Sequence, residues 1–331
     1  MRAAVIDAGS VSVETVDDPT PGPREVVVKV AACGLCGTDL HIADGEFAPT
    51  LPVVPGHEFA GTVVALGSGV EDLAVGDRVA VDPSLHCGAC HFCRLGRGNL
   101  CDNWAAIGVS TTGGAAEYAA APARNCVRLA DGVRLEDAAL IEPLSCALHG
   151  YDVLPRRPGE HYLLYGAGTM GLMMLQLARH AGAASVSVVD LNRERLPTAA
   201  KLGAEATAAD ADEFDRPQGW EVVIDCTGVV PAIEAGLGHV RKGGTFLQFG
   251  VASDTAKASW SPFRVYSQEI TILGSMAVLH SFERAAGLFA AGVLDALTMI
   301  TDRLPLESYP AALAAFRSGA GLKTQVVPGQ G

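Results

Sequence analysis

Residues 161–182 read HYLLYGAGTMGLMMLQLARHAG, an apolar strand pattern that runs through a glycine-rich turn into an apolar helix pattern. Gly166 permits the tight turn, Gly168 lets a pyrophosphate approach the backbone, and Gly171 allows the helix to pack closely on the strand. The helix N-terminus also favours the negative charge of the pyrophosphate. The stretch therefore predicts a dinucleotide-binding unit rather than a simple strand-to-helix turn.

The segments that follow repeat this order of strand and helix. SVSVVDLN precedes RERLPTAAKLG, and WEVVIDCTG precedes VPAIEAGLGHV and the strand-like GGTFLQFG. Three such units and a further strand, joined by short turns, are typical of a doubly wound parallel sheet. We therefore predict a Rossmann domain over residues 150–276.

The second strand of this domain ends at Asp190, where a carboxylate can accept hydrogen bonds from the adenosine ribose hydroxyls and repel a 2′-phosphate. This position predicts NAD as the cofactor in preference to NADP. Arg193 and Arg195 follow closely in the sequence. Because an arginine near this carboxylate attracts a phosphate, they weaken the preference.

The two ends of the chain have a different pattern. Up to about residue 82, short β-rich runs such as EVVVKVAACG, GTVVALG and DRVAVD alternate with Gly, Pro and Asp clusters, which predicts a partly open barrel of short strands. After ITILGSM we expect a helix at about 282–292, a strand in LTMITDRLPL, a helix at about 309–318 and a strand in LKTQVVP. This tail is too small to be a domain, so we expect residues 1–149 and 277–331 to form one.

Composition excludes several classes of protein. A chain of 331 residues with 49% hydrophobic content can bury two cores, and its net charge of −13 would repel nucleic acids and anionic membrane surfaces. The N-terminus has no export signal, and the most apolar stretch, residues 162–178, is interrupted by glycines. We predict a soluble, cytoplasmic protein, in which the nine cysteines are reduced thiols and metal ligands.

Four of these cysteines lie in LHCGACHFCRLGRGNLC, at positions 87, 90, 93 and 101. The spacing C-x2-C-x2-C-x7-C fits a closed tetrahedral zinc site of four thiolates better than a set of disulfides. Four sulfur ligands leave no open position for a substrate, so we predict a structural zinc. His91 is surplus to this set and is expected to face solvent.

A catalytic zinc needs three protein ligands and one open position. Cys36 and His57 are candidates, although a single Cys or His is more often a packed residue than a ligand. LIEPLSCALHG offers Glu142, with Cys146 and His149 nearby. We favour Glu142, because burying an unpaired carboxylate between an apolar run and a proline is costly.

Together these motifs resemble the zinc-containing medium-chain dehydrogenase/reductase superfamily, and within it the polyol (sorbitol-type) dehydrogenases and their threonine dehydrogenase relatives. The resemblance rests on CGLCGTDLH, GHEFAGTVVALGSGV, the four cysteines, EP, GAGTMG and CTG, in the order of the family. It implies an α/β protein with a GroES-like partly open β-barrel catalytic domain and a Rossmann domain. It also implies two zinc ions per chain and a homo-oligomer, with a tetramer favoured over a dimer.

The resemblance assigns roles around the catalytic zinc. Cys36, His57 and Glu142 become its ligands, with Glu142 binding directly or through water. Glu58 acts as a catalytic residue that can exchange into the shell, and Asp39 orients His57.

The same resemblance predicts a proton relay and further cofactor contacts. Thr38 matches the hydroxyl that contacts the substrate oxygen, and His41 matches the end of the relay, because an imidazole can take up a proton and release it to solvent near neutral pH. The cofactor contacts expected besides the glycines and Asp190 are Thr169, Met170, Arg195, Thr227, Gly250, Val251, Gly274 and Ser275.

The substrate is less closely defined by the sequence. Sorbitol-type enzymes carry an Arg-Tyr pair where this chain has Ala277 and Val278, and an aromatic residue where it has Ile42. We predict a zinc-dependent oxidoreductase that passes a hydride from a polyol or sugar-like secondary alcohol to NAD. The alternatives are a threonine or amino-alcohol dehydrogenase, a simple secondary-alcohol dehydrogenase, and a non-catalytic protein that binds nucleotide and zinc. A zinc-free quinone reductase is disfavoured, because that class lacks the ligands and the cysteine lobe.

Overall fold

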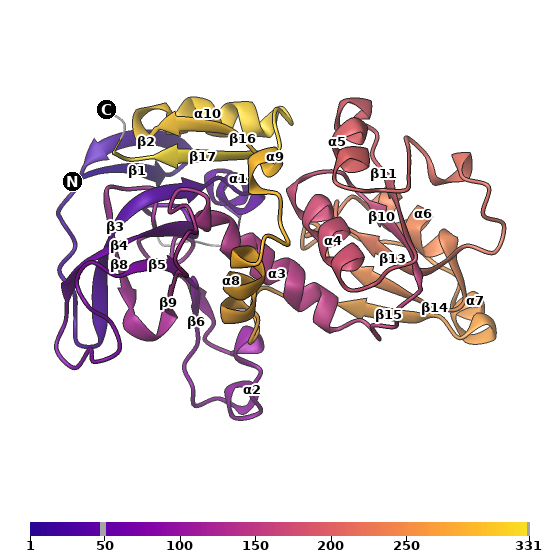
Figure 1. Cartoon of the computed structure of the whole chain (residues 1–331), viewed down its shortest axis with the longest axis horizontal. Coiled ribbons are helices and arrows are strands. Elements are labelled where there is room, and N and C mark those ends of the chain that lie inside the picture. Colours follow the sequence, from indigo (N-terminus) through magenta and orange to yellow (C-terminus); the bar gives the residue numbers. More distant parts are fainter. Residues whose placement is uncertain (47–50, 330–331) are drawn as a thin grey trace. The chain divides into compact units, whose positions relative to one another are not determined.

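The computed structural model describes residues 1–46 and 51–329 of the chain. They fall into two compact units, drawn in Figure 1, each with its own sheets and core. Unit 1 comprises Met1–Ser145, Val278–Gly292 and Ala296–Gly331, and unit 2 comprises Cys146–Ala277 and Val293–Asp295.

The described part of unit 2 contains a six-stranded parallel sheet in the order β12-β11-β10-β13-β14-β15. The chain starts at the centre and moves outward first to one edge and then to the other, which is the Rossmann order. The strands are β10 (His161–Tyr165), β11 (Ser185–Val189), β12 (Ala206–Ala208), β13 (Trp220–Asp225), β14 (Val240–Gln248) and β15 (Thr271–Gly274). The predicted doubly wound sheet is confirmed.

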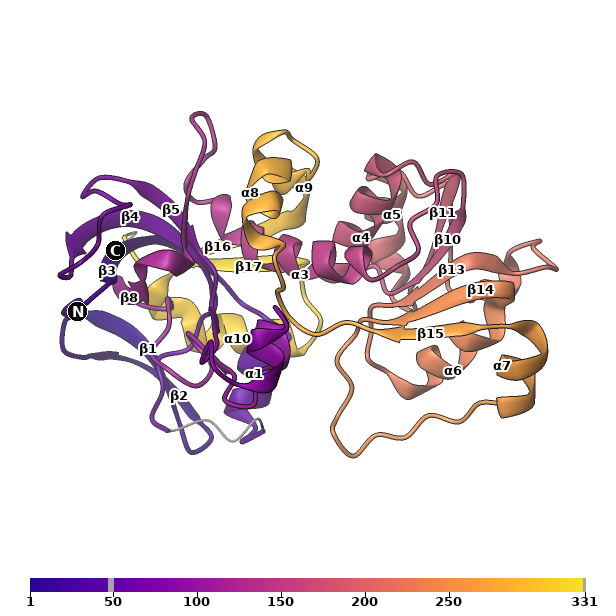
Figure 2. The same ribbon diagram turned by 90° about the horizontal axis from the view of Figure 1, so that it is seen from below.

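Helices cover both faces of this sheet, with α4 and α5 on one side and α6 and α7 on the other (Figure 2). They are α4 (Thr169–His180), α5 (Leu196–Lys201), α6 (Val230–His239) and α7 (Pro262–Gln268), with short 3-10 turns η4 (Arg193–Arg195) and η5 (Ala211–Glu213). β10 is buried along most of its length, as expected of a central parallel strand. Two elements were not predicted from the sequence: β12, which has only three residues, and α7, which buries none of its side chains.

The main sheet of unit 1 has seven strands among the described residues, in the order β16-β17-β3-β4-β5-β9, with β8 also paired to β3. Its strands are β3 (Glu25–Gly34), β4 (Glu58–Leu66), β5 (Arg78–Val81), β8 (Tyr118–Pro122), β9 (Cys126–Arg128), β16 (Ile300–Pro305) and β17 (Lys323–Val327). β17 pairs with β3 in antiparallel fashion, so the C-terminal strands complete a sheet that the N-terminal region begins.

Two small sheets and several helices surround this sheet. The small sheets pair β1 (Arg2–Asp7) with β2 (Ser10–Thr15) and β6 (Ser84–Leu85) with β7 (Ala105–Ala106). The helices are α1 (Gly37–Ala43), α2 (His91–Arg94), α8 (Phe282–Ala290), α9 (Ala296–Met299) and α10 (Tyr309–Arg317). Short 3-10 turns are η1 (Gly98–Leu100), η2 (Ala123–Asn125), η3 (Ala138–Leu140) and η6 (Leu306–Ser308). Helix α3 (Ile141–Asp152) has residues in both units.

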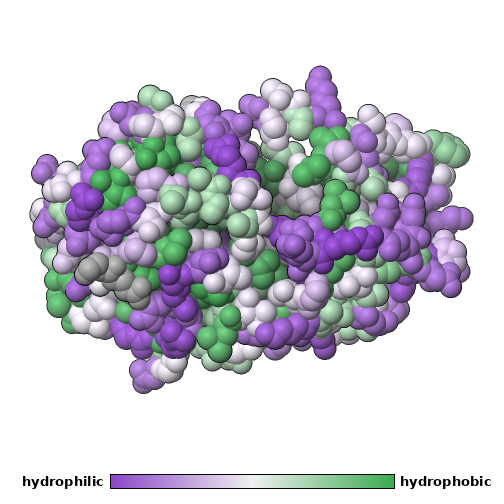
Figure 3. Space-filling view, turned by 90° about the horizontal axis from the view of Figure 1, so that it is seen from above, coloured by the Kyte–Doolittle hydropathy of each residue, from purple (hydrophilic) through white to green (hydrophobic). Residues whose placement is uncertain are grey.

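The predicted helices at about 282–292 and 309–318 correspond to α8 and α10. The strand predicted in LTMITDRLPL is wrong at its start, because residues 297–299 belong to α9 and β16 begins only at Ile300. In the described residues no helix is both long and apolar enough to cross a bilayer. Figure 3 shows polar and apolar residues interspersed over one face of the molecule.

Candidate active site

The pairing of β3 with β4 brings the candidate metal ligands together. Gly34, the last residue of β3, lies opposite Glu58, the first residue of β4. Cys36 follows β3 at the start of α1, and His57 immediately precedes β4. The ligand atoms of Cys36, His57 and Glu58 consequently lie within 4.8 Å of one another.

The electrostatics of this cluster suit a bound cation. Burial by itself lowers the pKa of the His57 imidazole. The hydrogen bond and the charge of Cys36, joined by the charges of Asp39 and Glu142, outweigh burial and raise this pKa to about 10. The surrounding groups therefore stabilise positive charge at the position of the imidazole, as they would stabilise a metal ion beside it.

Two buried polar atoms support this interpretation. Asp39 is fully buried and accepts a hydrogen bond from the Cys36 backbone N–H through Oδ2, at 2.8 Å. Its Oδ1, and Nδ1 of His57, have no hydrogen-bond partner among the described residues. Buried polar atoms are normally satisfied. A thiolate, an imidazole and nearby carboxylates are a donor set that zinc prefers, so these residues fit the predicted metal.

The two carboxylates near the cluster are placed differently. Glu142 lies in the first turn of α3, is buried and acts on His57 through its charge, but it is outside the tight group of Cys36, His57 and Glu58. Cys146 and His149, the other candidates in that segment, are outside this group as well. Glu58 forms a buried ion pair with Lys323, whose Nζ lies 2.8 and 2.7 Å from its two carboxylate oxygens.

Lys323 was not predicted as a site residue. It begins β17, whose sequence KTQVV has three polar residues among five, so the sequence gives no sign that every residue of this strand is buried. Its ion pair with Glu58 is visible only in the folded chain.

The two residues of the predicted proton relay lie on α1. Thr38 Oγ1 is 3.8 Å from Cys36 Sγ, and His41 follows one turn later on the same side of the helix. Nδ1 of His41 lies 2.5 Å from an oxygen of Glu46, an exposed residue that was not predicted from the sequence. The arrangement leads from the metal cluster toward solvent.

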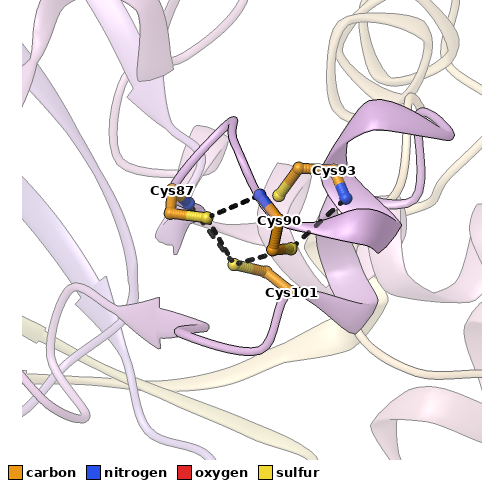
Figure 4. Close-up of side chains that lie close together, drawn as sticks. All are labelled: Cys87, Cys90, Cys93 and Cys101. Atoms are coloured by element: carbon orange, nitrogen blue, oxygen red, sulfur yellow. Dashed lines mark hydrogen bonds between the residues drawn. The ribbon is translucent and has the colours of Figure 1, made fainter.

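The four cysteines of the lobe form a second cluster, in which their sulfur atoms are turned toward one another (Figure 4). Cys87 Sγ lies 3.5 Å from Cys101 Sγ, which is 3.9 Å from Cys90 Sγ. Hydrogen bonds from the backbone N–H groups of Ala89 and Cys90 lower the pKa of Cys87 to about 6, whereas desolvation and the neighbouring thiols of Cys90 and Cys101 raise the pKa of Cys93. Since thiolates are the form that binds zinc, this geometry suits a four-sulfur site, and His91 is exposed beside it.

The glycine-rich turn of unit 2 has the geometry that the motif predicts. Gly166 has a φ of 104°, and a Cβ at Gly171 would lie 1.8 Å from the carbonyl oxygen of Gly166. A Cβ at Gly168 would meet nothing closer than Arg195 Nη1, at 3.6 Å. Gly168 therefore leaves a free approach to the backbone at the start of α4.

Asp190 lies directly beside this turn. Its Oδ2 accepts a hydrogen bond from the Ala167 N–H at 2.7 Å, its Oδ1 accepts one from the Asn192 N–H at 2.8 Å, and Arg195 Nη1 is 3.9 Å away. The other predicted cofactor residues follow the carboxyl ends of their strands or begin α4, along the edge where ligands of such sheets bind. These residues are Thr169, Met170, Thr227, Gly250, Val251, Gly274 and Ser275.

Asp225, at the end of β13, was not predicted. It is fully buried and accepts hydrogen bonds from the Thr227 hydroxyl at 2.6 Å and from the Gly228 N–H at 2.9 Å. These hydrogen bonds hold the backbone of the CTG turn, residues 226–228, in place.

The fold and these two cysteine-containing clusters define a class, the two-domain zinc-binding dehydrogenases. Residues 22–131 match the model of the alcohol dehydrogenase GroES-like domain, and residues 169–291 match that of the zinc-binding dehydrogenase domain. The chain is 39% identical to D-arabinitol dehydrogenase 1 of Uromyces fabae, over 96% of this chain and 94% of that protein. The chain belongs to the zinc-containing alcohol dehydrogenase family, as predicted, and is an oxidoreductase of that family.

Two further similarities bear on function. L-threonine 3-dehydrogenase of Streptomyces avermitilis is 36% identical over 98% of each chain. A crystal structure of a zinc-binding dehydrogenase from Sinorhizobium meliloti 1021 bound to NADP has a TM-score of 0.95 and 36% identity over 99% of each chain. The predicted fold class is confirmed, and the family uses zinc and a nicotinamide cofactor.

Proposed function

We propose that this protein oxidises a secondary hydroxyl of a polyol or sugar-like substrate to the ketone, with NAD as the hydride acceptor. The observation that carries the proposal is the group formed by half-buried Cys36, buried His57 and buried acidic residues beside Thr38 in the GroES-like unit. The chain is similar over nearly its full length to a D-arabinitol dehydrogenase, and this similarity supports a polyol as the substrate.

The zinc would be held by Cys36 and His57, with Glu142 as the third ligand and Asp39 orienting His57. Zinc supplies Lewis acidity that favours loss of the hydroxyl proton near neutral pH. Glu58, whose ligand atom lies within 4.8 Å of those of Cys36 and His57, is the residue that can exchange into the zinc shell in this proposal.

The chain's own residues then move the proton and orient the substrate. Thr38 accepts the substrate hydroxyl proton and passes it toward His41, which releases it to solvent. Glu46 accepts a hydrogen bond from Nδ1 of His41 and thereby holds the imidazole at the partly exposed end of the relay. A nicotinamide held by the glycine-rich turn and Asp190 of unit 2 would supply the hydride acceptor for the substrate carbon.

The cofactor in this proposal is NAD. Asp190 stands at the end of β11 beside the glycine-rich turn, where it would accept the ribose hydroxyls and repel a 2′-phosphate. Arg195 faces Asp190, and a similar protein has been crystallised with NADP. We therefore propose a preference for NAD and not an exclusion of NADP.

The proposed substrate is supported by the apolar residues Ile42 and Val278, which stand where sorbitol-type enzymes carry an aromatic residue and part of an Arg-Tyr pair. Ile42 is buried in an apolar cluster with Ile6 and Val53, and Val278 is buried too. Neither side chain supplies a polar contact for a long sugar alcohol. We propose a shorter polyol or diol, with threonine or a simple secondary alcohol as the alternatives.

In this proposal residues 1–149 and 277–331 form the catalytic domain and residues 150–276 bind NAD. The cysteine lobe holds a second, structural zinc. The protein acts in the cytoplasm as a homo-oligomer, with a tetramer favoured, and β15 supplies one contact. β15 is an edge strand on which Thr271 and Ile272 are exposed, and such edges pair readily with a second copy.

The test combines metal analysis with a substrate panel followed by NADH absorbance. We expect two zinc ions per chain and oxidation of a short polyol or diol. Faster oxidation of threonine than of every polyol would overturn the substrate. Two zinc ions without NADH formation from any alcohol would favour the non-catalytic alternative.

A further inference from the structure

We infer that a basic pocket at the amino end of the Rossmann sheet binds a small phosphorylated molecule, at a site separate from that of the cofactor. The pocket lies between the turn before β13, the junction of α6 with β14, and α7, all of which belong to unit 2. Both α6 and α7 pack against β14 (Figure 1). The cavity has a volume of about 650 Å³, which is within the range of sites for small molecules.

The lining of this pocket is basic in an acidic protein. Its cations are Arg216, Arg241, Lys242 and Arg264, with His239 beside them, and none of the described lining residues is Asp or Glu. The whole chain has 37 acidic and 24 basic residues, so this local excess of positive charge is opposite to its composition. Because a concave surface with one sign of charge concentrates ions of the other sign, the pocket favours an anion.

The pocket is at the opposite end of the sheet from the cofactor residues. Gly219 immediately precedes β13 and Val240 begins β14, so both lie at the amino ends of their strands. The glycine-rich turn and Asp190 follow the carboxyl ends of β10 and β11. The strands of this sheet are parallel, so their amino ends and their carboxyl ends lie on opposite sides. The pyrophosphate of the cofactor therefore does not account for this pocket.

Carboxylates neutralise only part of the positive charge. Glu221 forms ion pairs with Arg216, at 3.5 Å, and with Arg241, at 3.4 Å. Nε of Arg241 is nevertheless buried without a hydrogen-bond partner among the described residues. Lys242 is exposed, and its side chain has no bonded partner in the part of the chain that the structure describes. Arg241 and Lys242 thus keep donors for a ligand.

Arg264 removes a feature that would otherwise repel an anion. The carboxyl end of α6 faces this pocket, and the last carbonyl groups of a helix carry partial negative charge. Arg264 donates hydrogen bonds to the carbonyl oxygens of Gly238, at 3.1 Å, and Val240, at 2.8 Å. It also bonds the Leu237 carbonyl. A guanidinium group has five N–H donors, so Arg264 covers these carbonyls and still has donors left.

The chemistry of these side chains favours a phosphate group. A guanidinium group can donate two parallel hydrogen bonds to one phosphate, and an ammonium group adds a compact positive charge. A phosphate monoester carries about 1.5 to 2 negative charges near neutral pH, so it matches the local excess of charge better than a single carboxylate does. We expect the phosphate to bind Arg241 and Lys242.

The test is a titration of the full-length protein with inorganic phosphate at constant ionic strength. Saturating NAD is present, so that the pyrophosphate site is occupied. Trp220 reports on the pocket, because its ring lies 5.7 Å from the guanidinium carbon of Arg216. We expect a saturable change in tryptophan fluorescence that chloride does not produce and that Trp220→Phe abolishes.

Two double variants with the same change of net charge locate the site. Arg241→Gln combined with Lys242→Gln should weaken phosphate binding by at least about tenfold, because hydrogen bonds to charged groups are lost. Lys201→Gln combined with Lys257→Gln, at exposed positions outside the pocket, should leave the affinity unchanged. If the first double variant does not fold, exposed Lys242→Gln alone makes the same comparison and should also weaken binding.

Three results would overturn the inference. They are equal phosphate affinity in the two double variants, a fluorescence change that chloride reproduces, and a response to an acidic peptide without one to phosphate. The first would place phosphate elsewhere, the second would show screening only, and the third would assign the surface to a protein partner. Because binding is measured without turnover, none of them bears on the proposed dehydrogenase activity.

Discussion

Cys36 and His57 stand at the end of β3 and the start of β4, and the pairing of those two strands makes them neighbours. Their side chains are the parts of the proposed metal site with the fewest alternatives, because both belong to the tight group of ligand atoms. Substitution of one of these two ligands therefore tests the proposed metal site most directly.

Cys36→Ser is expected to remove one of two zinc ions and to lower turnover by more than about a hundredfold, because an alcohol is a far weaker zinc ligand than a thiolate. NAD binding should be nearly unchanged, since the predicted cofactor residues belong to unit 2. Zinc content, turnover and a cofactor titration check this. Cys126→Ser, a half-buried cysteine of β9 outside both clusters, is the control. Loss of NAD binding together with zinc would show that Cys36 has a structural role instead.

Asp190→Ala is expected to raise the Kd of NAD by about tenfold, because a hydrogen bond to a charged group contributes about 1.5–3 kcal/mol. The Kd of NADP should change much less. Asp190 also bonds the Ala167 and Asn192 N–H groups, but loss of those bonds affects both cofactors alike. The ratio of the two Kd values, measured by fluorescence titration, therefore isolates the ribose contact. Exposed Asp254→Ala is the control, and an unchanged ratio would remove Asp190 from the cofactor site.

At the scale of elements, the cysteine lobe and the glycine-rich turn have opposite requirements. The lobe around α2 buries few side chains, so it depends on its four sulfur atoms. The turn between β10 and α4 requires glycines, because a side chain at Gly171 would clash with the Gly166 carbonyl and one at Gly168 would fill the space beside the backbone.

Cys101→Ser is expected to lower stability before it lowers activity. Losing a structural zinc should reduce the free energy of unfolding by at least about 2 kcal/mol and Tm by several degrees. Thermal melts with and without a chelator, together with zinc content, measure this. The parent protein should lose stability on chelation and the variant should lose little more. A variant that keeps its second zinc and its Tm but loses turnover would show that the lobe takes part in the chemistry.

The two glycines of the turn should respond differently to alanine. Gly171→Ala places a Cβ on the Gly166 carbonyl and should destabilise the protein by about 1–3 kcal/mol. Gly168→Ala meets no close neighbour, so stability should change by less than about 1 kcal/mol while cofactor affinity falls, because the methyl group blocks the pyrophosphate. Urea unfolding and cofactor titration separate the two effects. Equal stability of both variants would contradict this division of roles.

At the scale of the whole molecule, the exposed edge of the Rossmann sheet governs assembly in our proposal. Ile272 on β15 is 38% exposed. Ile272→Asp should place a charge at the edge and produce a smaller species in light scattering. Leu297→Asp, at a 73% exposed position of unit 1, should leave the mass unchanged. The same mass for both variants and the parent would mean that this edge is not the contact.

Much of this architecture follows from patterns that are local in the sequence. The alternation of strand and helix after residue 160 predicts the parallel sheet, and the spacing of Gly166, Gly168 and Gly171 predicts the geometry of its first turn. The short β12 and the exposed α7 escaped prediction because three residues carry no periodicity and an unburied helix has no apolar stripe.

Some residues of the candidate site could be predicted from the sequence and others could not. Cys36, His57 and the four lobe cysteines are identifiable from the sequence because each stands in a short motif whose residue types and spacing suit zinc. Lys323, the partner of Glu58, could not be identified from the sequence. It lies 265 residues away from Glu58, on a strand that comes close to Glu58 only because β17 pairs with β3. An ion pair between such distant residues depends on which strands become neighbours, and only the folded chain contains that information.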